Sequence, residues 1–230
     1  TLIDQWPAHI EAIRKNGLIA DFNGEEVVAN LPIFSPEEID HQNEQVDLII
    51  ALTKAQQLDA MFKAIQPMIT EKTYVLCLLN GLGHEDVLEK YVPKENILVG
   101  ITMWTAGLEG PGRVKLLGDG EIELENIDPS GKKFALEVVD VFQKAGLNPS
   151  YSSNVRYSIW RKACVNGTLN GLCTILDCNI AEFGALPVSE SLVKTLISEF
   201  AAVAEKEAIH LDQAEVYTHN RKSTRLNSSH

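Results

Sequence analysis

The sequence predicts an α/β fold with a doubly wound sheet, followed by an all-α region. Over about the first 150 residues, apolar runs of strand length alternate with helical segments, which is the pattern of a parallel sheet covered by helices. From Val155 onward the apolar period is helical throughout. We therefore expect a boundary near residue 150, with one domain over residues 1–150 and a second over residues 151–219.

The elements of the first domain follow from capping and turn residues. Residues 1–4 read as the end of a strand, and a helix follows from Pro7 to about Asn16, with Gly17 at its C-cap. Asn23-Gly24 is a hairpin signal. The apolar run Val46–Leu52 predicts a buried parallel strand. Further along we expect a helix over 55–65, a strand over 74–79, a helix to about 91 and a strand over 97–103. A Gly-rich turn at 107–120 leads into two more strands, over 114–117 and 121–125. A helix over 132–145 and an extended piece over 148–153 complete the domain.

The second domain is predicted to hold helices over about 159–172, 180–183 and 188–208. Residues 220–230 fit neither domain, since they are basic and polar and lack a periodic pattern. They also match what a common sequencing-library adapter would encode. We expect them to be a non-native, adapter-derived tail without regular structure, and we leave them out of the fold.

Composition narrows the function classes. The formal net charge of −12 argues against nucleic-acid binding, which needs a basic surface. Apolar runs are far too short to span a membrane. The four cysteines have no metal-ligand spacing, so we expect buried thiols in a reducing cytoplasm and neither a metal site nor disulfides.

The most informative pattern is a polar stripe in the apolar helix near residue 160. Lys162, Asn166 and Asn170 recur at four-residue intervals and therefore share one helix face. A polar stripe among apolar neighbours costs stability unless something pairs with it. A substrate carboxylate and carbonyl would be such partners. Spacing alone equally allows a lysine that reaches solvent and two asparagines that bond to nearby backbone.

Three more polar residues follow predicted strands, at the edge where open α/β sheets bind ligands. Asn80 opens the turn Asn80-Gly81-Leu82-Gly83, whose glycines permit close backbone approach. Lys54 follows the strand Val46–Leu52 and could contact a cofactor phosphate or simply be solvated. Asp4 ends the first strand fragment, where an acid in a Rossmann unit accepts ribose hydroxyls and favours NAD over NADP. As a strand-end acid it could equally be a turn residue.

Together these residues resemble the ketopantoate reductase (2-dehydropantoate 2-reductase) family, from Thr1 to about His219. The resemblance runs through the following positions: Lys54, the Asn80 turn, Gly100-x-Thr102, Gly112-x-Val114, Gly118-x-Gly120 and Trp160-x-Lys162-x3-Asn166-x3-Asn170. It implies a Rossmann-type domain that lacks its first strand and Gly-x-Gly-x-x-Gly turn, followed by the first part of a helical substrate domain. It also implies further helices after His219, so the fragment as given is expected to be inactive.

The resemblance further implies an NAD(P)H-dependent reduction of a 2-oxo acid, above all ketopantoate to (R)-pantoate. Lys162 would be the general acid that protonates the 2-oxo oxygen. Asn166 and Asn170 would hold substrate oxygens. Lys54 and Asn80 would contact the cofactor, with Asn80 also helping to place Lys162. The family implies a cytoplasmic enzyme, with a homodimer as an option for the full-length protein.

Three choices stay open. NADP(H) is the family default, whereas Asp4 suggests NAD(H). Trp104 could be plain core or could shape a pocket for an apolar 2-oxo acid, and an NAD-dependent D-2-hydroxyacid dehydrogenase of the mandelate type is therefore the alternative function. A dinucleotide-binding sensor without catalysis is a third reading, against which the shared presence of Lys162 and the asparagines argues. A further family asparagine falls at Ile180 by count and at Asn179 only after a shift of one residue, so it is not assigned.

Overall fold

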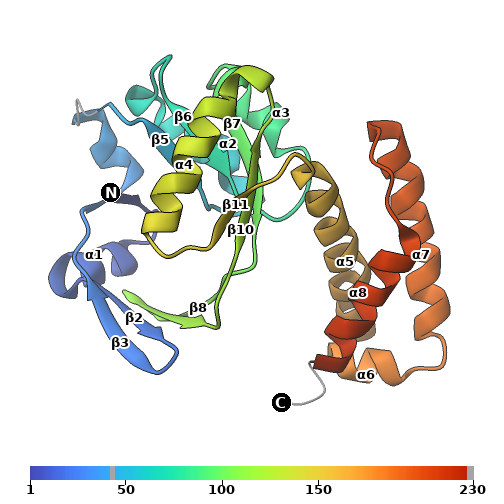
Figure 1. The fold of residues 1–230 in the computed structure, drawn as a ribbon. Coiled ribbons are helices and arrows are strands. Elements are labelled where there is room, and N and C mark those ends of the chain that lie inside the picture. Colours follow the sequence, from blue (N-terminus) through green and yellow to red (C-terminus); the bar gives the residue numbers. More distant parts are fainter. Residues whose placement is uncertain (42–44, 227–230) are drawn as a thin grey trace. The chain divides into compact units, whose positions relative to one another are not determined.

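The computed structural model describes residues 1–41 and 45–226, and the chain divides into two compact units (Figure 1). The sheet-containing unit comprises residues 1–79 and 83–153. The helical unit comprises residues 80–82 and the chain from residue 154 onward. The short segment 80–82 therefore groups by contact with the helical unit, although it begins only three residues after strand β6 (Tyr74–Cys77) of the sheet.

A five-stranded sheet in the order β11-β10-β7-β6-β5 forms the centre of the sheet-containing unit. Its strands are β5 (Leu48–Ala51), β6 (Tyr74–Cys77), β7 (Ile97–Thr102), β10 (Ile122–Asn126) and β11 (Pro149–Tyr151). Strands β5, β6 and β7 are parallel, while β10 runs antiparallel to β7 and parallel to β11. The sheet is therefore mixed, with the parallel Rossmann-type part predicted from the alternating pattern.

Helices cover this sheet because their apolar residues recur on one face. In α4 (Lys132–Lys144) the buried residues are Ala135, Val138 and Phe142, which pack with Leu98 and Leu124 of the strands. Helix α2 (Leu58–Ala64) supplies Met61 to a second cluster, and the short α3 (His84–Leu88) buries Leu88. Single 3-10 turns occur at η1 (Pro36–His41), η2 (Ala55–Gln57), η3 (Gln66–Met68), η4 (Lys94–Asn96) and η5 (Pro129–Gly131).

Two smaller sheets complete this unit. One pairs β1 (Leu2–Ile3) with β4 (Ile33–Phe34) in parallel. The other has the order β3-β2-β9-β8, with β2 (Leu18–Phe22) and β3 (Glu25–Ala29) joined by the predicted Asn23-Gly24 hairpin. The strands β8 (Thr105–Gly110) and β9 (Arg113–Leu117) complete it, and α1 (Pro7–Asn16) packs against β2 and β4.

Strand β8 (Thr105–Gly110) corrects the expectation that the residues ahead of the predicted strand 114–117 form only a Gly-rich turn. Its residues are almost all exposed and it pairs only with β9. An exposed edge strand needs no apolar alternation, so the sequence carries no period-two signal there.

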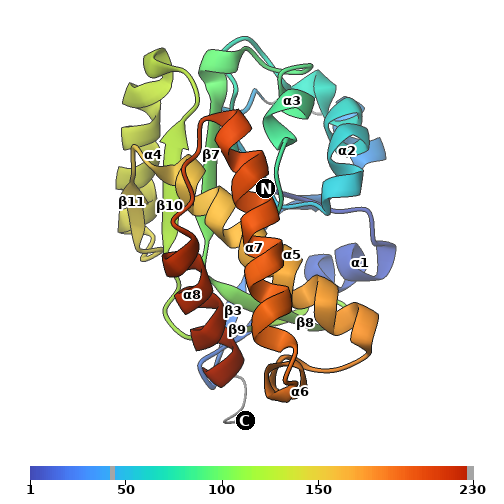
Figure 2. The ribbon, with the colours of Figure 1, turned by 90° about the vertical axis from the view of Figure 1, so that its right-hand side faces the viewer.

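The helical unit contains α5 (Val155–Leu176), α6 (Ile180–Ala185), α7 (Ser189–Ala204) with the 3-10 turn η6 (Glu205–Glu207), and α8 (Gln213–Leu226). Helices α5, α7 and α8 contact one another pairwise, and Figure 2 shows their arrangement. Their shared core consists of Cys164, Leu169, Phe183, Val193, Ile197 and Val216. Of the core residues on α5, Cys164 lies on the helix face opposite the polar stripe.

Helix α8 corrects the expectation of an unstructured tail after His219. Residues 220–226 continue the helix, and residues 227–230 lie outside the described part of the chain. The helix is nucleated upstream, where Asp212 Oδ1 accepts the N–H groups of Ala214 and Glu215 and Val216 is fully buried. Extending a helix by good helix formers such as Arg221 and Lys222 needs no second nucleus.

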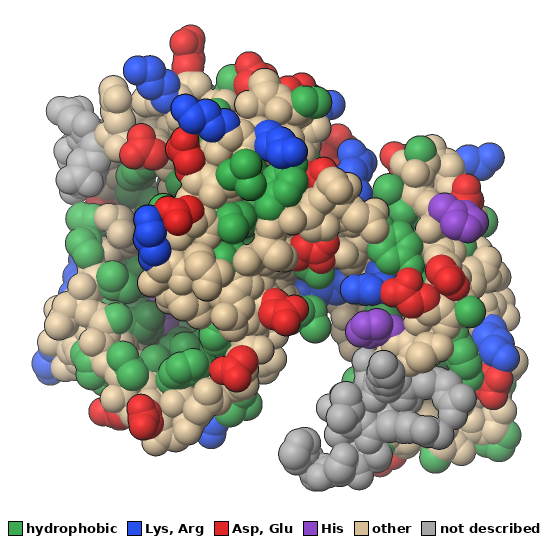
Figure 3. All heavy atoms as spheres, viewed as in Figure 1, with side chains coloured by type: hydrophobic (Ala, Val, Ile, Leu, Met, Phe, Trp, Pro, Cys, Tyr) green, Lys and Arg blue, Asp and Glu red, His purple; other side chains and the backbone are tan. Residues whose placement is uncertain are grey.

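Acidic and basic side chains are interspersed on the face shown in Figure 3. Among the residues that the structure describes, no helix has the length and apolar character to cross a membrane.

Candidate active site

Helix α5 brings Lys162, Asn166 and Asn170 onto one face, as their spacing predicts. Lys162 and Asn166 are half-buried, and Asn170 is exposed. Burial lowers the pKa of Lys162, because the surrounding protein disfavours the charged ammonium. A lysine with a lowered pKa gives up its proton more readily than a solvated one, which suits a general acid.

The buried residues of α5 explain why the stripe is held in place. Cys164 and Leu169 are buried in the core of the helical unit. Between them, Gly167 lets α7 approach closely, since a Cβ there would lie 2.7 Å from the Phe200 ring. The packing thus fixes the rotation of α5 about its axis, and with it the direction of the polar stripe.

A polar cluster beside Lys162 joins α5 to α8. The Glu215 carboxylate accepts hydrogen bonds from Tyr157 Oη at 2.5 Å and from Arg161 Nη1 at 2.6 Å. These two donors hold the pKa of Glu215 below its usual range, with the Tyr157 hydrogen bond as the larger cause. The cluster positions the helix turn that carries Lys162, and its acid lies 54 residues beyond Arg161, so no local sequence pattern indicates it.

The sheet edge carries Lys54 and Asn80 as predicted. Strands β5 and β6 are parallel and in register at Ala51 and Cys77, so both end at the same edge. Lys54 and Asn80 each follow their strand by three residues and are exposed. Gly81 and Gly83 have φ of 112° and 76°, values that only glycine adopts without strain, so the turn after Asn80 needs these residues.

Thr53, next to Lys54, is a candidate site residue that the sequence did not indicate. Its Oγ1 is buried at the end of β5 and has no hydrogen-bond partner in the described chain. Such an unpaired hydroxyl is costly unless a ligand or water completes it. The signal is burial in the folded unit, and a threonine after a strand does not reveal it in sequence.

Asp4 lies directly after β1 and is half-buried. Its Oδ1 accepts the N–H of Trp6 at 2.7 Å, which is a turn-forming role ahead of α1. Asp4 therefore acts as a turn residue in the structure, and a hydrogen bond from Asp4 to a cofactor ribose stays a prediction.

Two further residues have structural roles. Trp104 packs against the core of the five-stranded sheet, donates from Nε1 to the Leu147 carbonyl at 3.2 Å and lies against Gly120. This is the core reading of Trp104, while Met103 beside it is exposed. Asn179 caps α6, because its Oδ1 accepts the N–H of Glu182 at 2.9 Å.

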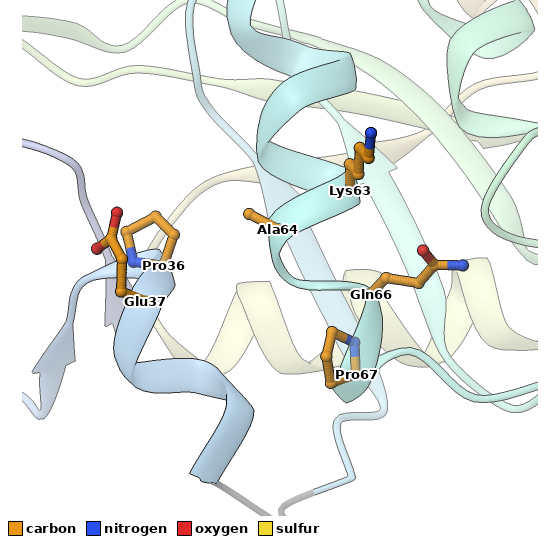
Figure 4. A pocket seen from close by; sticks show the side chains of 6 residues that line it. All are labelled: Pro36, Glu37, Lys63, Ala64, Gln66 and Pro67. Atoms are coloured by element: carbon orange, nitrogen blue, oxygen red, sulfur yellow. The ribbon is translucent and has the colours of Figure 1, made fainter.

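The sheet-containing unit also has a surface pocket of about 550 Å³ between η1 and the end of α2 (Figure 4). Its lining residues are Pro36, Glu37, Lys63, Ala64, Gln66 and Pro67. None of the predicted site residues lines it, and it lacks the converging polar groups of a reaction site. Among the described residues, no group of three or more His, Cys, Asp or Glu side chains could hold a metal ion.

By contact, Asn80 groups with the helical unit that carries Lys162, Asn166 and Asn170, whereas Asp4, Thr53 and Lys54 belong to the sheet-containing unit. The first set offers an ammonium and three side-chain amides. The second offers a carboxylate, a hydroxyl and an ammonium at strand ends. The first set can donate a proton and bind carbonyl or carboxylate oxygens, and the second set can bind phosphate or hydroxyl groups.

Comparison with known proteins identifies the family. The ketopantoate reductase PanE/ApbA family model matches residues 1–129, and the model of that family's C-terminal region matches residues 154–230. The 2-dehydropantoate 2-reductase of Lactococcus lactis is 54% identical over 95% of this chain and 70% of its own length.

Solved structures agree. One from Enterococcus faecalis, provisionally assigned as a 2-dehydropantoate 2-reductase, is 98% identical over 96% of this chain and 71% of its own, with a TM-score of 0.79. A D-mandelate dehydrogenase in complex with NADH and anilino(oxo)acetate is 52% identical over 97% of this chain and 71% of its own, with a TM-score of 0.92. The chain therefore belongs to the ketopantoate reductase family.

Proposed function

We propose that this chain is the greater part of an NAD(P)H-dependent reductase of 2-oxo acids, with 2-dehydropantoate as the substrate and (R)-pantoate as the product. The observation that carries the proposal is the stripe of Lys162, Asn166 and Asn170 on α5, with a half-buried lysine whose pKa is lowered by burial. The matching family and the Lactococcus lactis relative support the reaction class.

The residues of α5 divide the work. Lys162 donates a proton from Nζ to the 2-oxo oxygen of the substrate, so that the developing alkoxide is neutralised as it forms. Asn166 and Asn170 donate amide N–H groups to the substrate's oxygens and thereby orient the 2-oxo group toward Lys162. Asn80 supplies a further amide for placing the reacting groups. A non-catalytic dinucleotide sensor would have no use for a half-buried proton donor, which favours catalysis.

The strand ends fit a dinucleotide. The unpaired Thr53 hydroxyl, the exposed Lys54 ammonium and the glycine turn after Asn80 are the donors and the open backbone that phosphate and ribose groups need. When bound, the reduced nicotinamide supplies the hydride to the substrate's C2. We propose that Thr53 and Lys54 hold this cofactor and that a carboxylate at Asp4 favours NADH over NADPH by repelling a 2′-phosphate.

Steady-state kinetics with each cofactor tests that preference. We expect a higher kcat/KM with NADH, and we expect Asp4→Asn to narrow the difference because it removes the charge but keeps an oxygen for the Trp6 N–H. Asp128→Asn, in the same unit but at the start of η5, is the matched control. A tenfold preference for NADPH in the unmodified protein would overturn the assignment to Asp4.

The second candidate is an NAD-dependent D-2-hydroxyacid dehydrogenase of the mandelate type. The specific observation in its favour is the 52% identity to a D-mandelate dehydrogenase that was solved with NADH. Against it, Trp104 packs against the core of the five-stranded sheet and its Nε1 donates to the Leu147 carbonyl, which are contacts of a structural residue. A comparison of kcat/KM for ketopantoate and for benzoylformate, in the longest reading frame that contains residues 1–219, separates the two. A large advantage for benzoylformate would favour the dehydrogenase.

We further propose a cytoplasmic location, which the four free cysteines support. A homodimer of the full-length protein stays a prediction, to be checked by measuring the molar mass in solution.

A further inference from the structure

The end of α5 places two half-buried cysteines side by side. Asp177 adopts a left-handed conformation, with φ of 50°, and so ends the helix. The N–H of Cys178 then donates to the carbonyl oxygen of Cys173 at 3.1 Å, and the N–H of Asp177 donates to that of Thr174 at 3.4 Å. This pair of bonds is a Schellman motif, in which the side chains at the positions of Cys173 and Cys178 pack against each other.

Both side chains pack against the core of the helical unit. The pKa of the Cys173 thiol is raised, mainly by burial and next by the nearby Cys178 thiol. The other two cysteines lie in different surroundings. Cys77 is buried in β6 and Cys164 in the core of the helical unit, and burial raises the pKa of each to about 11. Thiols that hold their protons this firmly and have little access to solvent react slowly with oxidants.

We propose that Cys173 and Cys178 form an intramolecular disulfide in the presence of an oxidised low-molecular-weight disulfide, which makes the end of α5 a redox-sensitive modification site. A disulfide requires the two Cα atoms to lie about 4.4–6.8 Å apart. The Cys178 N–H to Cys173 carbonyl bond at 3.1 Å brings the backbones of the two residues into direct contact. The termination of the helix has therefore already brought the two residues together.

The chemistry is a two-step thiol–disulfide exchange. The Cys178 thiolate attacks one sulfur of the small disulfide and displaces the other sulfur as a thiolate, which leaves a mixed disulfide on Cys178. The Cys173 thiolate then attacks the Cys178 sulfur and displaces the second small thiolate. In sum, two protein thiols are oxidised, one small disulfide is reduced to two thiols, and the two protons of the protein thiols pass to the released thiolates. We assign the second step to Cys173 because burial raises its pKa and so disfavours its reactive thiolate.

The modification would bear on the polar stripe. Asn170 lies one turn before Cys173, and Thr174 Oγ1 donates to the Asn170 carbonyl at 2.7 Å. A covalent link from Cys173 to Cys178 ties this last turn of α5 to the start of α6. We expect it to suppress fraying there, with slower amide exchange over residues 174–180.

The test exposes the folded protein, in its longest reading frame, to oxidised glutathione, blocks the remaining thiols by alkylation and maps the cysteines by fragmentation mass spectrometry. We expect a product that has lost two hydrogen atoms, with Cys173 and Cys178 joined and with Cys77 and Cys164 unmodified. Cys173→Ser should stop at a glutathione adduct on Cys178, because the second thiol is missing. Protein unfolded in denaturant serves as the control in which all four cysteines become alkylated.

Three results would overturn the proposal. The wild type could accumulate glutathione adducts on both cysteines without a cross-link, or Cys173→Ser could give the same product as the wild type. The third contradicting result would be a disulfide that includes Cys164. Hydrogen exchange supplies an independent readout, since an internal cross-link that leaves exchange over 174–180 unchanged would contradict the expected effect on α5.

Discussion

In each of the two units, a glycine allows two segments of the chain to approach closely, but the neighbour that the glycine meets differs. In the sheet-containing unit, a Cβ at Gly100 of β7 would lie 2.5 Å from the backbone oxygen of Glu123 in β10. In the helical unit, a Cβ at Gly167 of α5 would meet the ring of Phe200 at 2.7 Å. The first neighbour is hydrogen-bonded main chain, and the second is a side chain that can rotate.

This difference teaches where the molecule can change. A sheet whose strands meet backbone to backbone holds its cofactor residues at fixed strand ends and tolerates little alteration. Helices that meet side chain to side chain can repack, so their polar faces are free to vary with the substrate. Catalytic identity is therefore expected to reside in the helical unit, and rigidity in the sheet.

The largest expected effect is on the helical unit's chemistry. Lys162→Ala should lower kcat by about 10²–10⁴-fold without unfolding the protein, because it removes the proton donor and little packing. Steady-state kinetics and thermal unfolding measure the two effects separately. Lys206→Ala, an exposed lysine of the same unit, is the matched control and should leave both unchanged. Near-native turnover of 2-oxo acids by Lys162→Ala would remove this residue from the mechanism.

Gly100→Ala tests the rigidity of the sheet. We expect a loss of about 3 kcal/mol in the free energy of unfolding, at the upper end of the range for overpacking, because the Glu123 carbonyl cannot move without breaking the β7–β10 pairing. Gly107→Ala in β8 has no atom within 4 Å of its Cβ and should be nearly neutral. Denaturant unfolding of both variants decides the point, and equal stabilities would contradict the comparison between the units.

Gly167→Ala should cost less, about 1–2 kcal/mol, since the Phe200 ring can move aside. The double variant with Phe200→Leu should recover part of that loss. Gly171→Ala, four residues along the same helix, meets nothing within 4 Å and should stabilise the protein by about 0.5–1 kcal/mol through helix propensity. If Gly167→Ala and Gly171→Ala change the free energy of unfolding by the same amount, then contact with the Phe200 ring does not make an alanine at position 167 unfavourable.

The smallest effect is a shift along the pH axis. Burial lowers the pKa of Lys162 below that of an ordinary lysine, so the proton donor is lost earlier as pH rises and kcat/KM for reduction should fall there. In that same window the unfolded chain binds more protons than the folded one, so stability should rise with pH while activity declines. Paired pH profiles of rate and thermal stability measure this. If kcat/KM stays constant up to the pH at which an ordinary lysine loses its proton, then the pKa of Lys162 does not control the reaction.

The sequence was most informative where local chemistry decides the structure. Pro7 and Gly17 bound α1 as predicted, and Asn23-Gly24 forms its hairpin, because caps and tight turns depend on a few neighbouring residues. The spacing of Lys162, Asn166 and Asn170 placed them on one face for the same reason. In contrast, β8 is an edge strand that depends on pairing with β9. Helix α8 was not predicted, because its C-terminal part is polar and the sequence does not show that Val216 is buried.

The candidate site shows the same limit. The exposed strand-end residues Lys54 and Asn80 could be predicted from where apolar runs stop. The unpaired hydroxyl of Thr53 and the joining of Tyr157 and Arg161 by Glu215 depend on burial and on long-range contacts, which no local pattern encodes.

The pairing of β2 with β9 has a consequence for how the chain folds during synthesis. Ile19 and Arg113 are register partners in parallel strands, so this small sheet cannot close until more than ninety further residues have left the ribosome. Until then β2 has an open edge, in addition to that of the outer strand β3, which could pair with another chain. The helical unit joins neighbouring helices through short connections and can assemble as soon as it emerges. Slow translation over residues 30–110 would therefore prolong the interval in which the N-terminal hairpin is vulnerable to aggregation.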